Sequence, residues 1–417
     1  MKPLALLLAL APLASAQLQI DPEVADEISK IKAFDNHAHP VLPAAGDTGY
    51  DALPVEHMDP YTEPVRTRAG APAVAEATHQ LFSDRPRQEV IEQKRDAYPT
   101  WILDQLGIET MLANRIAMGP GIAPPRFLWV PFEDALMYPL NNASLASSNS
   151  DRQAFFSDEE QVLRRYLKEC GYAKPPATLG KYLQKVVDRT LERHKRGGAV
   201  AVKFEAAYLR SLDFDDVPRG VAEAVYDRGR GTAIPDADYK QLQDYIFRYI
   251  AAEAGRLGMA VHLHVSWGPG GYFHIAGTNP LLLESVVNDP GLHQTNFVLL
   301  HGGWPFTREI TALLTKPNVY ADFSAETLLN YPQSMSRILR EWLEFAPDKV
   351  LFGTDAYPYS EENGWEQSGW IAIHTTREAL GLALTGMLND GEITRPRALE
   401  LAHMVLHDTA AKLYRLR

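Results

Sequence analysis

Segments with strand and helix patterns alternate along the second half of the chain, and this alternation constrains the possible fold more than any other feature. Short apolar runs rich in β-branched residues predict buried strands at 197–208, 259–266, 296–303, 318–324 and 349–355. Helical patterns lie between them at 236–258, 279–287, 306–314 and 335–345. One strand and one helix together cover about thirty residues, which is typical of βαβ units in a parallel sheet.

Three more strands are predicted in the first half of the chain, at 31–39, 108–116 and 127–132. Eight strand–helix units favour an α/β fold of the closed (β/α)8 type, a TIM-like barrel, which typically takes about 250 residues plus insertions. An open doubly wound sheet is the structural alternative, but it would not need eight strands. We therefore expect one barrel domain over residues 17–417.

Two long insertions account for most of the surplus length. Residues 40–98 follow the first strand and include a helical stretch around 73–94. Residues 133–195 follow the third strand and include helical patterns near 158–169 and 179–195. Both insertions follow the carboxyl ends of strands, where a barrel carries its active site. We interpret them as lids or pocket walls rather than as separate domains.

The composition is that of an ordinary globular protein, with 46% hydrophobic and 23% charged residues. The net charge is −12 and basic residues form no long run, so nucleic-acid binding has little support. The single cysteine, Cys170, excludes an intramolecular disulfide. No segment is apolar enough to predict a membrane-spanning helix, and the sequence is compatible with a monomer or a homo-oligomer.

The amino terminus, MKPLALLLALAPLASAQ, predicts a signal peptide over residues 1–16. Lys2 supplies the positive start, an apolar core follows, and Ala14-Ser15-Ala16 fits a small-x-small cleavage site. We expect export to the periplasm or the medium and a mature chain that starts at Gln17.

Five side chains that can bind a metal lie at predicted strand ends. His37 and His39 stand in DNHAHP at the end of the first strand, His264 ends MAVHLH, His301 ends NFVLLH and Asp355 ends KVLFGTD. A single histidine at a strand end is more often a hydrogen-bonded structural residue than a ligand. Five such residues are harder to explain in that way, because the strand ends of a barrel meet around one pocket.

Imidazole and carboxylate together suit zinc and other first-row divalent metals. The sequence therefore predicts a metal centre with one or two ions, most consistent with Zn²⁺. A divalent ion would activate a water molecule and polarise a carbonyl group. Asp355 would then act as general base and later as general acid.

Lys203 and Glu205 share one face of the fourth strand, and their roles stay open. Lys203 is expected to bridge two metals as a carbamate, to pair with Glu205 or to bind an anionic substrate, whereas Glu205 is also a possible metal ligand. His262 lies two residues deeper than His264, so we expect a supporting or core role for it. Three further residues are candidate substrate contacts: Asn114, Arg115 and His274. A salt bridge of Arg115 that only holds the lid is an equal alternative, and a histidine in a loop such as His274 is more often a solvated residue.

The motifs DNHAHP, HLHVSWG, LLHGGWP and LFGTDAYP, in this order, resemble the amidohydrolase superfamily, in particular its amidohydrolase-related metal-dependent hydrolase branch. The resemblance implies a distorted (β/α)8 barrel. It implies metal ligation by His37, His39, His264, His301 and Asp355. It further implies that Asp355 moves the proton of the attacking water and that His301 binds a second metal or polarises the substrate.

These observations favour an exported metal-dependent hydrolase that cleaves a C–N or C–O bond of a small molecule. The alternative is a metal-dependent lyase or decarboxylase that acts on a small carboxylic acid held by Arg115 or Lys203. A binding protein that has kept the metal is a third hypothesis, but it would not need the proton carrier Asp355. The sequence has no nucleophile elbow, P-loop or H-E-x-x-H motif, which removes other hydrolase and nucleotide-binding classes.

Overall fold

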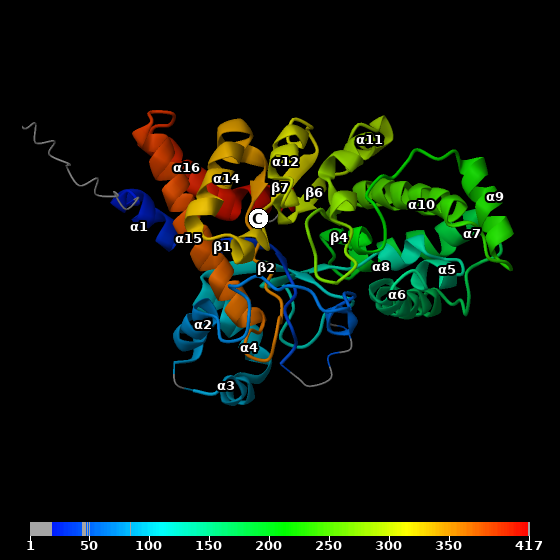
Figure 1. Cartoon of the computed structure of the whole chain (residues 1–417), viewed down its shortest axis with the longest axis horizontal. Helices are drawn as coiled ribbons and strands as arrows, with labels where there is room; N and C mark the ends of the chain where they lie inside the picture. The colour runs from blue at the N-terminus through cyan, green and yellow to red at the C-terminus, as the bar shows by residue number, and fades with distance from the viewer. Residues whose placement is uncertain (1–18, 44–46, 48, 50, 84, 416–417) are drawn as a thin grey trace, which may run out of the picture.

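The computed structural model describes residues 19–43, 47, 49, 51–83 and 85–415 (Figure 1). Eight strands lie within these residues, each at a predicted position. They are β1 (Ala33–Ala38), β2 (Ile108–Asn114), β3 (Phe127–Val130), β4 (Ala201–Phe204), β5 (Ala260–His264), β6 (Phe297–Leu300), β7 (Val319–Asp322) and β8 (Val350–Leu351).

The strands form a three-stranded sheet, β1-β2-β3, and a five-stranded sheet, β4-β5-β6-β7-β8, and all neighbours are parallel. Isolated parallel bridges join the edges of the two sheets: Trp129 with Ala199 and Phe132 with Lys203 on one side, and Ala38 with Ala356 on the other. The predicted TIM-type (β/α)8 architecture is therefore confirmed, although only isolated bridges, and no continuous strand pairing, join the two sheets among the described residues.

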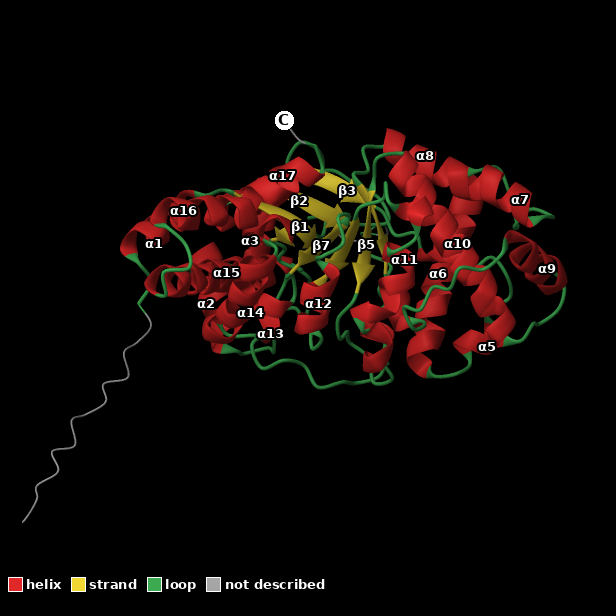
Figure 2. Cartoon of the chain, turned by 90° about the horizontal axis from the view of Figure 1, so that it is seen from above, coloured by secondary structure: helices red, strands yellow, loops and turns green. Residues whose placement is uncertain are grey.

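Helices surround the strands on the outside (Figure 2). They are α1 (Pro22–Lys30), α2 (Pro72–Phe82), α3 (Arg87–Lys94), α4 (Tyr98–Leu106), α5 (Ala143–Ala146), α6 (Ser150–Glu169), α7 (Leu179–Tyr182), α8 (Asp188–Arg196), α9 (Arg219–Gly229), α10 (Asp236–Arg256), α11 (Glu284–Val287), α12 (Thr307–Leu313), α13 (Glu326–Leu329), α14 (Pro332–Phe345), α15 (Trp365–Asn389), α16 (Arg395–His403) and α17 (Thr409–Leu413).

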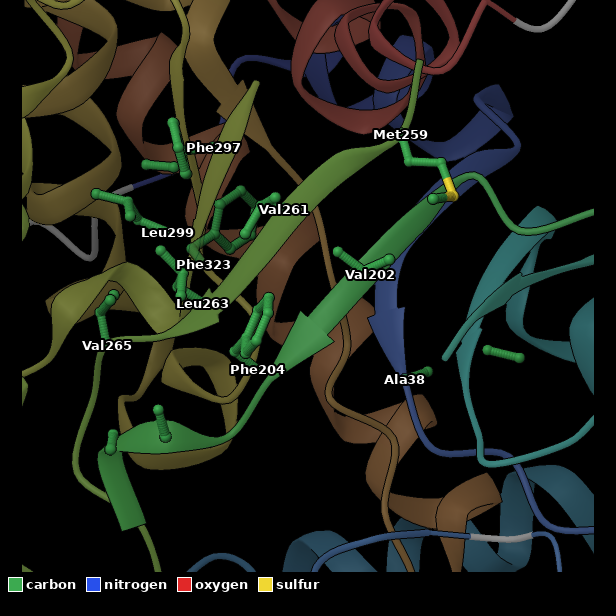
Figure 3. Packing of buried hydrophobic residues seen from close by; sticks show 14 of the residues in the cluster. Ala38, Val202, Phe204, Met259, Val261, Leu263, Val265, Phe297, Leu299 and Phe323 are labelled. Carbon is green, nitrogen blue, oxygen red and sulfur yellow. The ribbon is translucent and has the colours of Figure 1, made fainter. Parts of the chain in front are cut away.

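The main hydrophobic core fills the layer between strands and helices. Outward-facing side chains of β4, β5 and β6, among them Phe204, Val261 and Phe297, belong to it (Figure 3). A second cluster includes Phe34, Ala201, Val298 and Leu351 from the strands and Ala410 from α17, with Tyr414 packed against it. The carboxyl-terminal helix thus packs against strand residues of this inner cluster, and the metal-competent residues at the strand ends lie outside it.

Two predicted helices differ from the observed ones. The stretch 73–94 is broken into α2 and α3, because Pro86 has no backbone N–H to donate and is excluded from a helix interior. The stretch 279–287 begins as a 3-10 turn over Pro280–Leu283 and only then continues as α11. The segment 179–195 is helical, but a π-helical turn over Leu183–Val187 separates α7 from α8.

The two insertions occupy opposite sides of the strand ring (Figure 1). The first contributes α2 and α3 and an irregular loop over 51–67 that reaches over the carboxyl ends of the strands. The second contributes α5 to α8, which gather beside α9 and α10. Asp151 in α6 connects them, because its carboxylate accepts hydrogen bonds from the backbone N–H of Asp59 at 2.6 Å and of Tyr272 at 2.8 Å.

Among the described residues, no helix has the length and apolar character needed to cross a membrane. The predicted signal peptide lies within residues 1–18, which are outside the described part of the chain.

The two hydrogen bonds of Asp151 give a first prediction. Asp151→Ala leaves two backbone N–H groups without acceptors, so we expect a loss of about 1–3 kcal/mol in the free energy of unfolding. Chemical denaturation measures the change. Asp26→Ala on α1 is the control, because its salt bridge to Lys30 is exposed to solvent and contributes little to stability. Equal stabilities of the two variants would contradict the role of Asp151.

Candidate metal centre

The five predicted metal ligands come together at the carboxyl ends of the strands. His37 belongs to β1 and His264 ends β5. His39 and His301 directly follow β1 and β6, and Asp355 lies four residues after the end of β8. All four imidazoles are buried. His39, His264, His301 and Asp355 also line one cavity. The sequence argument that strand ends share a pocket therefore agrees with their positions.

Asp355 lies at the centre of one half of this site. Its Oδ1 atom is 3.1 Å from His37 Nε2 and 3.6 Å from His39 Nε2. The two histidine Nε2 atoms are 3.3 Å apart. Ligand atoms of His37, His301 and Asp355 all lie within 4.8 Å of one another, a spacing at which three groups can hold one ion.

The other half of the site is formed by β4, β5 and β6. The rings of His264 and His301 are 4.6 Å apart between centroids. Glu205, directly after β4, has its Oε2 atom 3.5 Å from His264 Nδ1. Its other oxygen, Oε1, is 3.0 Å from Lys203 Nζ. Of the uses considered for Lys203, the structure shows the ion pair with Glu205.

A partner on its outer nitrogen orients each of three histidine rings. His39 Nδ1 donates to Asp51 at 2.6 Å, and His301 Nδ1 donates to Ser324 Oγ at 3.0 Å. His264 Nε2 donates to the carbonyl of Ser266 at 2.9 Å. Each bond places the proton on the outer nitrogen, so the inner nitrogen keeps the lone pair that a cation needs.

The Asn114 amide holds the fourth ring. Its Nδ2 atom lies 2.8 Å from His37 Nδ1 and donates to the carbonyl of Ala38 at 3.1 Å. This leaves His37 Nε2 facing Asp355. Asn114, predicted to contact substrate, therefore contacts a histidine of the site and is absent from the described cavity lining.

Burial keeps three of the imidazoles neutral. It lowers the pKa of His37, His264 and His301 well below the usual range, and the positive charge of Lys203 adds to the effect. His39 differs: burial opposes its protonation, but Asp51 and Asp355 outweigh burial and raise its pKa. Burial also raises the pKa of Glu205 and Asp355.

The donor set fits a divalent cation. Glu205 Oε2 is buried and accepts no hydrogen bond from the described residues, which is costly for a carboxylate unless a positive charge lies beside it. The neutral imidazoles of His264 and His301, which carry their protons on the outer nitrogens, offer lone pairs in the same place. The residues that would hold one or two ions are His37, His39, Glu205, His264, His301 and Asp355.

The backbone around the site departs from ordinary conformations. His301 has φ of 62° and Asp355 has φ of 54°, the left-handed region that non-glycine residues rarely adopt. Such strain costs about 1–3 kcal/mol per residue and concentrates at functional sites. Both side chains are thereby turned toward the cavity at the point where their strands end.

Two predicted substrate contacts, Arg115 and His274, are not among the described residues that line the cavity. The guanidinium of Arg115 is buried, and it bonds to the carbonyl groups of Pro40 and Ala117 and, at 2.7 Å, to Asp47. It therefore braces the start of the first insertion. His274 is exposed and lies outside the cavity lining. His262, predicted to have a supporting role, is bonded to Tyr414 Oη at 2.7 Å beneath the site.

Sequence reasoning missed several residues of the site. Asp51 and Ser324 orient histidines, and Tyr61, Tyr208 and Tyr359 line the cavity. The strand-end rule identifies Ser324 if it is applied to the predicted strand 318–324. Asp51 and Tyr61 lie in an irregular loop with no periodic pattern, so the sequence carries no signal for them.

Comparison with known proteins agrees with this geometry. The sequence model of the family described as Amidohydrolase matches residues 183–416, more than half of the chain. Protein fluG of Emericella nidulans is 28% identical over 189 residues, which are 44% of this chain and 21% of the relative. The matched segment thus spans about a fifth of that protein's length.

Solved structures share the fold at low sequence identity. A Lactobacillus casei protein described as a metal-dependent hydrolase has a TM-score of 0.64 at 18% identity, with 94% of this chain and 99% of that chain covered. Uronate isomerase of Thermotoga maritima has a TM-score of 0.60 at 14% identity, with 95% and 98% covered. Glucuronate isomerase of Caulobacter crescentus has a TM-score of 0.59 at 14% identity, with 96% of each chain covered.

The family match covers five of the eight strand ends and includes His264, His301 and Asp355. The predicted resemblance is thereby confirmed, and the chain belongs to the amidohydrolase family of metal-dependent enzymes.

Proposed function

We propose that this enzyme is an exported hydrolase that uses a divalent metal, most consistent with Zn²⁺, to cleave a C–N or C–O bond of a small molecule. The observation that carries the proposal is the position of Asp355. Its carboxylate lies within 3.6 Å of both first-strand histidines, and its side chain is 16% exposed at the cavity, whereas that of His37 is fully buried.

The residues have separable tasks in this proposal. When bound, the metal ion lowers the pKa of a water molecule and polarises a carbonyl group. Asp355 accepts the proton of the attacking water and later donates it to the leaving group. Burial raises the pKa of Asp355, which makes its carboxylate a stronger base than a solvated aspartate. His301, held by Ser324, keeps a fixed orientation beside the substrate carbonyl or helps to hold the metal.

Hydrolysis is favoured over lyase chemistry. The lyase hypothesis required Arg115 or Lys203 as the partner of a substrate carboxylate. Arg115 is bound to Asp47 and to backbone carbonyls, and Lys203 is paired with Glu205 beneath the cavity. Product analysis separates the two reactions: incubation of metal-loaded protein with small esters, amides and lactones should give hydrolysis products, and carbon dioxide release from carboxylic acids would favour the lyase.

The metal ligands can be tested without knowing the substrate. His37→Ala and His264→Ala each remove one inner nitrogen, so elemental analysis after dialysis should find only a small fraction of the wild-type metal content. His293→Ala is the matched control, because His293 is exposed and remote from the cavity. Full retention of metal by the two site variants would overturn their assignment as ligands.

The role of Asp355 predicts a specific kinetic defect. Asp355→Asn keeps the side-chain shape but cannot accept the proton, so kcat should fall by about 10²–10⁴-fold while the affinity for a competitive inhibitor stays similar. The variants are compared at equal metal content, with Asp348→Asn as an exposed control. Wild-type turnover by metal-loaded Asp355→Asn would exclude it as the proton carrier.

Export remains a prediction from residues 1–16. In a bacterial host, intact-mass measurement of the exported fraction should give a chain that starts at Gln17. Ala16→Arg replaces the small residue before the cleavage point and should leave the precursor uncleaved. Accumulation of the uncleaved wild-type chain in the cytoplasm would contradict the prediction.

A further inference from the structure

Two adjoining cavities lie over the metal centre and share most of their walls. They contain about 390 and 470 Å³ of unfilled space, counting the solvent at their mouths. The shared walls consist of Tyr61, Tyr208, His264, Pro269, His301, Asp355 and Tyr359. The remaining lining residues are His39, Leu53, Val55, Pro64, Thr67, Glu205, Trp267, Ala325, Leu328, Leu329 and Tyr357.

Aromatic rings form much of this wall. The Tyr61 and Trp267 rings are 5.9 Å apart between centroids, and the Tyr357 and Tyr359 rings are 5.4 Å apart. The ring of Tyr208 lies 4.9 Å from that of His264. Planar aromatic groups are stabilised by such neighbours beyond the burial of their area.

The tyrosine hydroxyls add polar positions without charge. Among the described residues, the hydroxyls of Tyr61, Tyr208 and Tyr359 have no hydrogen-bond partner. A tyrosine hydroxyl is protonated at neutral pH and carries no charge. These hydroxyls can donate to and accept from an uncharged polar group of a ligand.

No lysine or arginine is among the described residues that line the two cavities. The buried Lys203 is already paired with Glu205, and the half-buried Arg66 and Arg210 are bound to Thr327 and Thr375 and to Asp244, respectively. Two carboxylates, Glu205 and Asp355, face the cavity instead. A substrate carboxylate away from the metal would lose its hydration and gain no counter-charge, which is strongly unfavourable.

We infer that the substrate is an uncharged aromatic amide or ester, whose ring occupies the tyrosine- and tryptophan-lined cavity and which carries no carboxylate on that ring. This inference rests on the proposed hydrolase function for the reacting bond. The selection against a ring carboxylate rests on the cavity alone. It names Tyr61, Tyr208, Tyr359 and Trp267 as the residues that determine substrate class.

Matched esters test the inference in turnover. 4-Carbamoylphenyl acetate and 4-carboxyphenyl acetate have the same shape and differ in one negative charge. After each rate is normalised to non-enzymatic hydrolysis, kcat/KM for the uncharged ester should be at least about tenfold higher. Equal values, or a preference for the carboxylate, would overturn the inference.

A binding measurement separates this inference from the hydrolase proposal. 4-Carbamoylbenzohydroxamate and 4-carboxybenzohydroxamate carry the same metal-binding group, so they place only the para substituent in the cavity. Calorimetry with the metal-loaded enzyme should give at least about tenfold tighter binding of the uncharged compound. That preference without any ester or amide hydrolysis would support the cavity inference and contradict the hydrolase proposal. Equal affinities would overturn the cavity inference even if hydrolysis is observed.

A designed cation provides the converse test. Leu329→Lys places an ammonium group in the half-buried wall, away from the proposed ligands. It should tighten binding of the carboxy hydroxamate by about tenfold and leave the metal content unchanged. Leu281→Lys is the control, because Leu281 is 43% exposed and outside the cavity. If Leu329→Lys folds normally, keeps its metal and still binds the carboxy hydroxamate with unchanged affinity, the missing counter-charge is not the reason why the cavity selects against a carboxylate.

Discussion

The burial of several ionisable side chains around one point is the constraint on which much of the structure depends. Charged groups lose their hydration there, so each must be neutral, paired or in contact with a cation. The imidazoles of His37, His264 and His301 are kept neutral, and Lys203 pairs with Glu205. The Oε2 atom of Glu205 accepts no hydrogen bond from the described residues and is therefore available to a cation. A bound cation would explain why these side chains come together although one buried oxygen has no protein partner.

A hydrogen-bond chain connects this cluster to the carboxyl-terminal end of the protein. His301 donates to Ser324, Ser324 donates to Asp322, and Asn36 donates to Asp322 at 2.8 Å. Tyr414, just after α17, donates to Asn36 and contacts His262. Burial raises the pKa of Asp322 to about 6. The residues that close the base of the barrel therefore also fix the orientation of a histidine in the site.

The strands and the main ligands could be predicted because both follow local rules. Buried parallel strands are continuous apolar runs, and their carboxyl ends meet at one face, so His264, His301 and Asp355 could be grouped without knowledge of contacts. Asp35 accepts hydrogen bonds from the backbone N–H and the hydroxyl of Thr354, which follows β8, and so connects β1 with the end of β8. Pro86 could have indicated the break between α2 and α3, but the helical pattern on both sides of it led to the prediction of one continuous stretch.

The walls of the pocket could not be predicted for a physical reason. Tyr61 and Asp51 come from a loop whose position is set by distant contacts, such as the hydrogen bond from Asp59 to Asp151. The contacts of Arg115 could not be predicted, because its partners, Pro40 and Asp47, belong to the first insertion, whose position the sequence does not indicate. The long helix α15 buries side chains all around, so it shows no amphipathic periodicity.

The most direct test of the metal centre is anomalous diffraction from a crystal of the zinc-loaded enzyme. The account predicts one or two anomalous peaks in the cavity, about 2.0–2.2 Å from the inner nitrogens of the site histidines and from a carboxylate oxygen of Asp355. A fully loaded crystal whose peaks lie only on other residues, with His37, His264 and Asp355 unliganded, would contradict it.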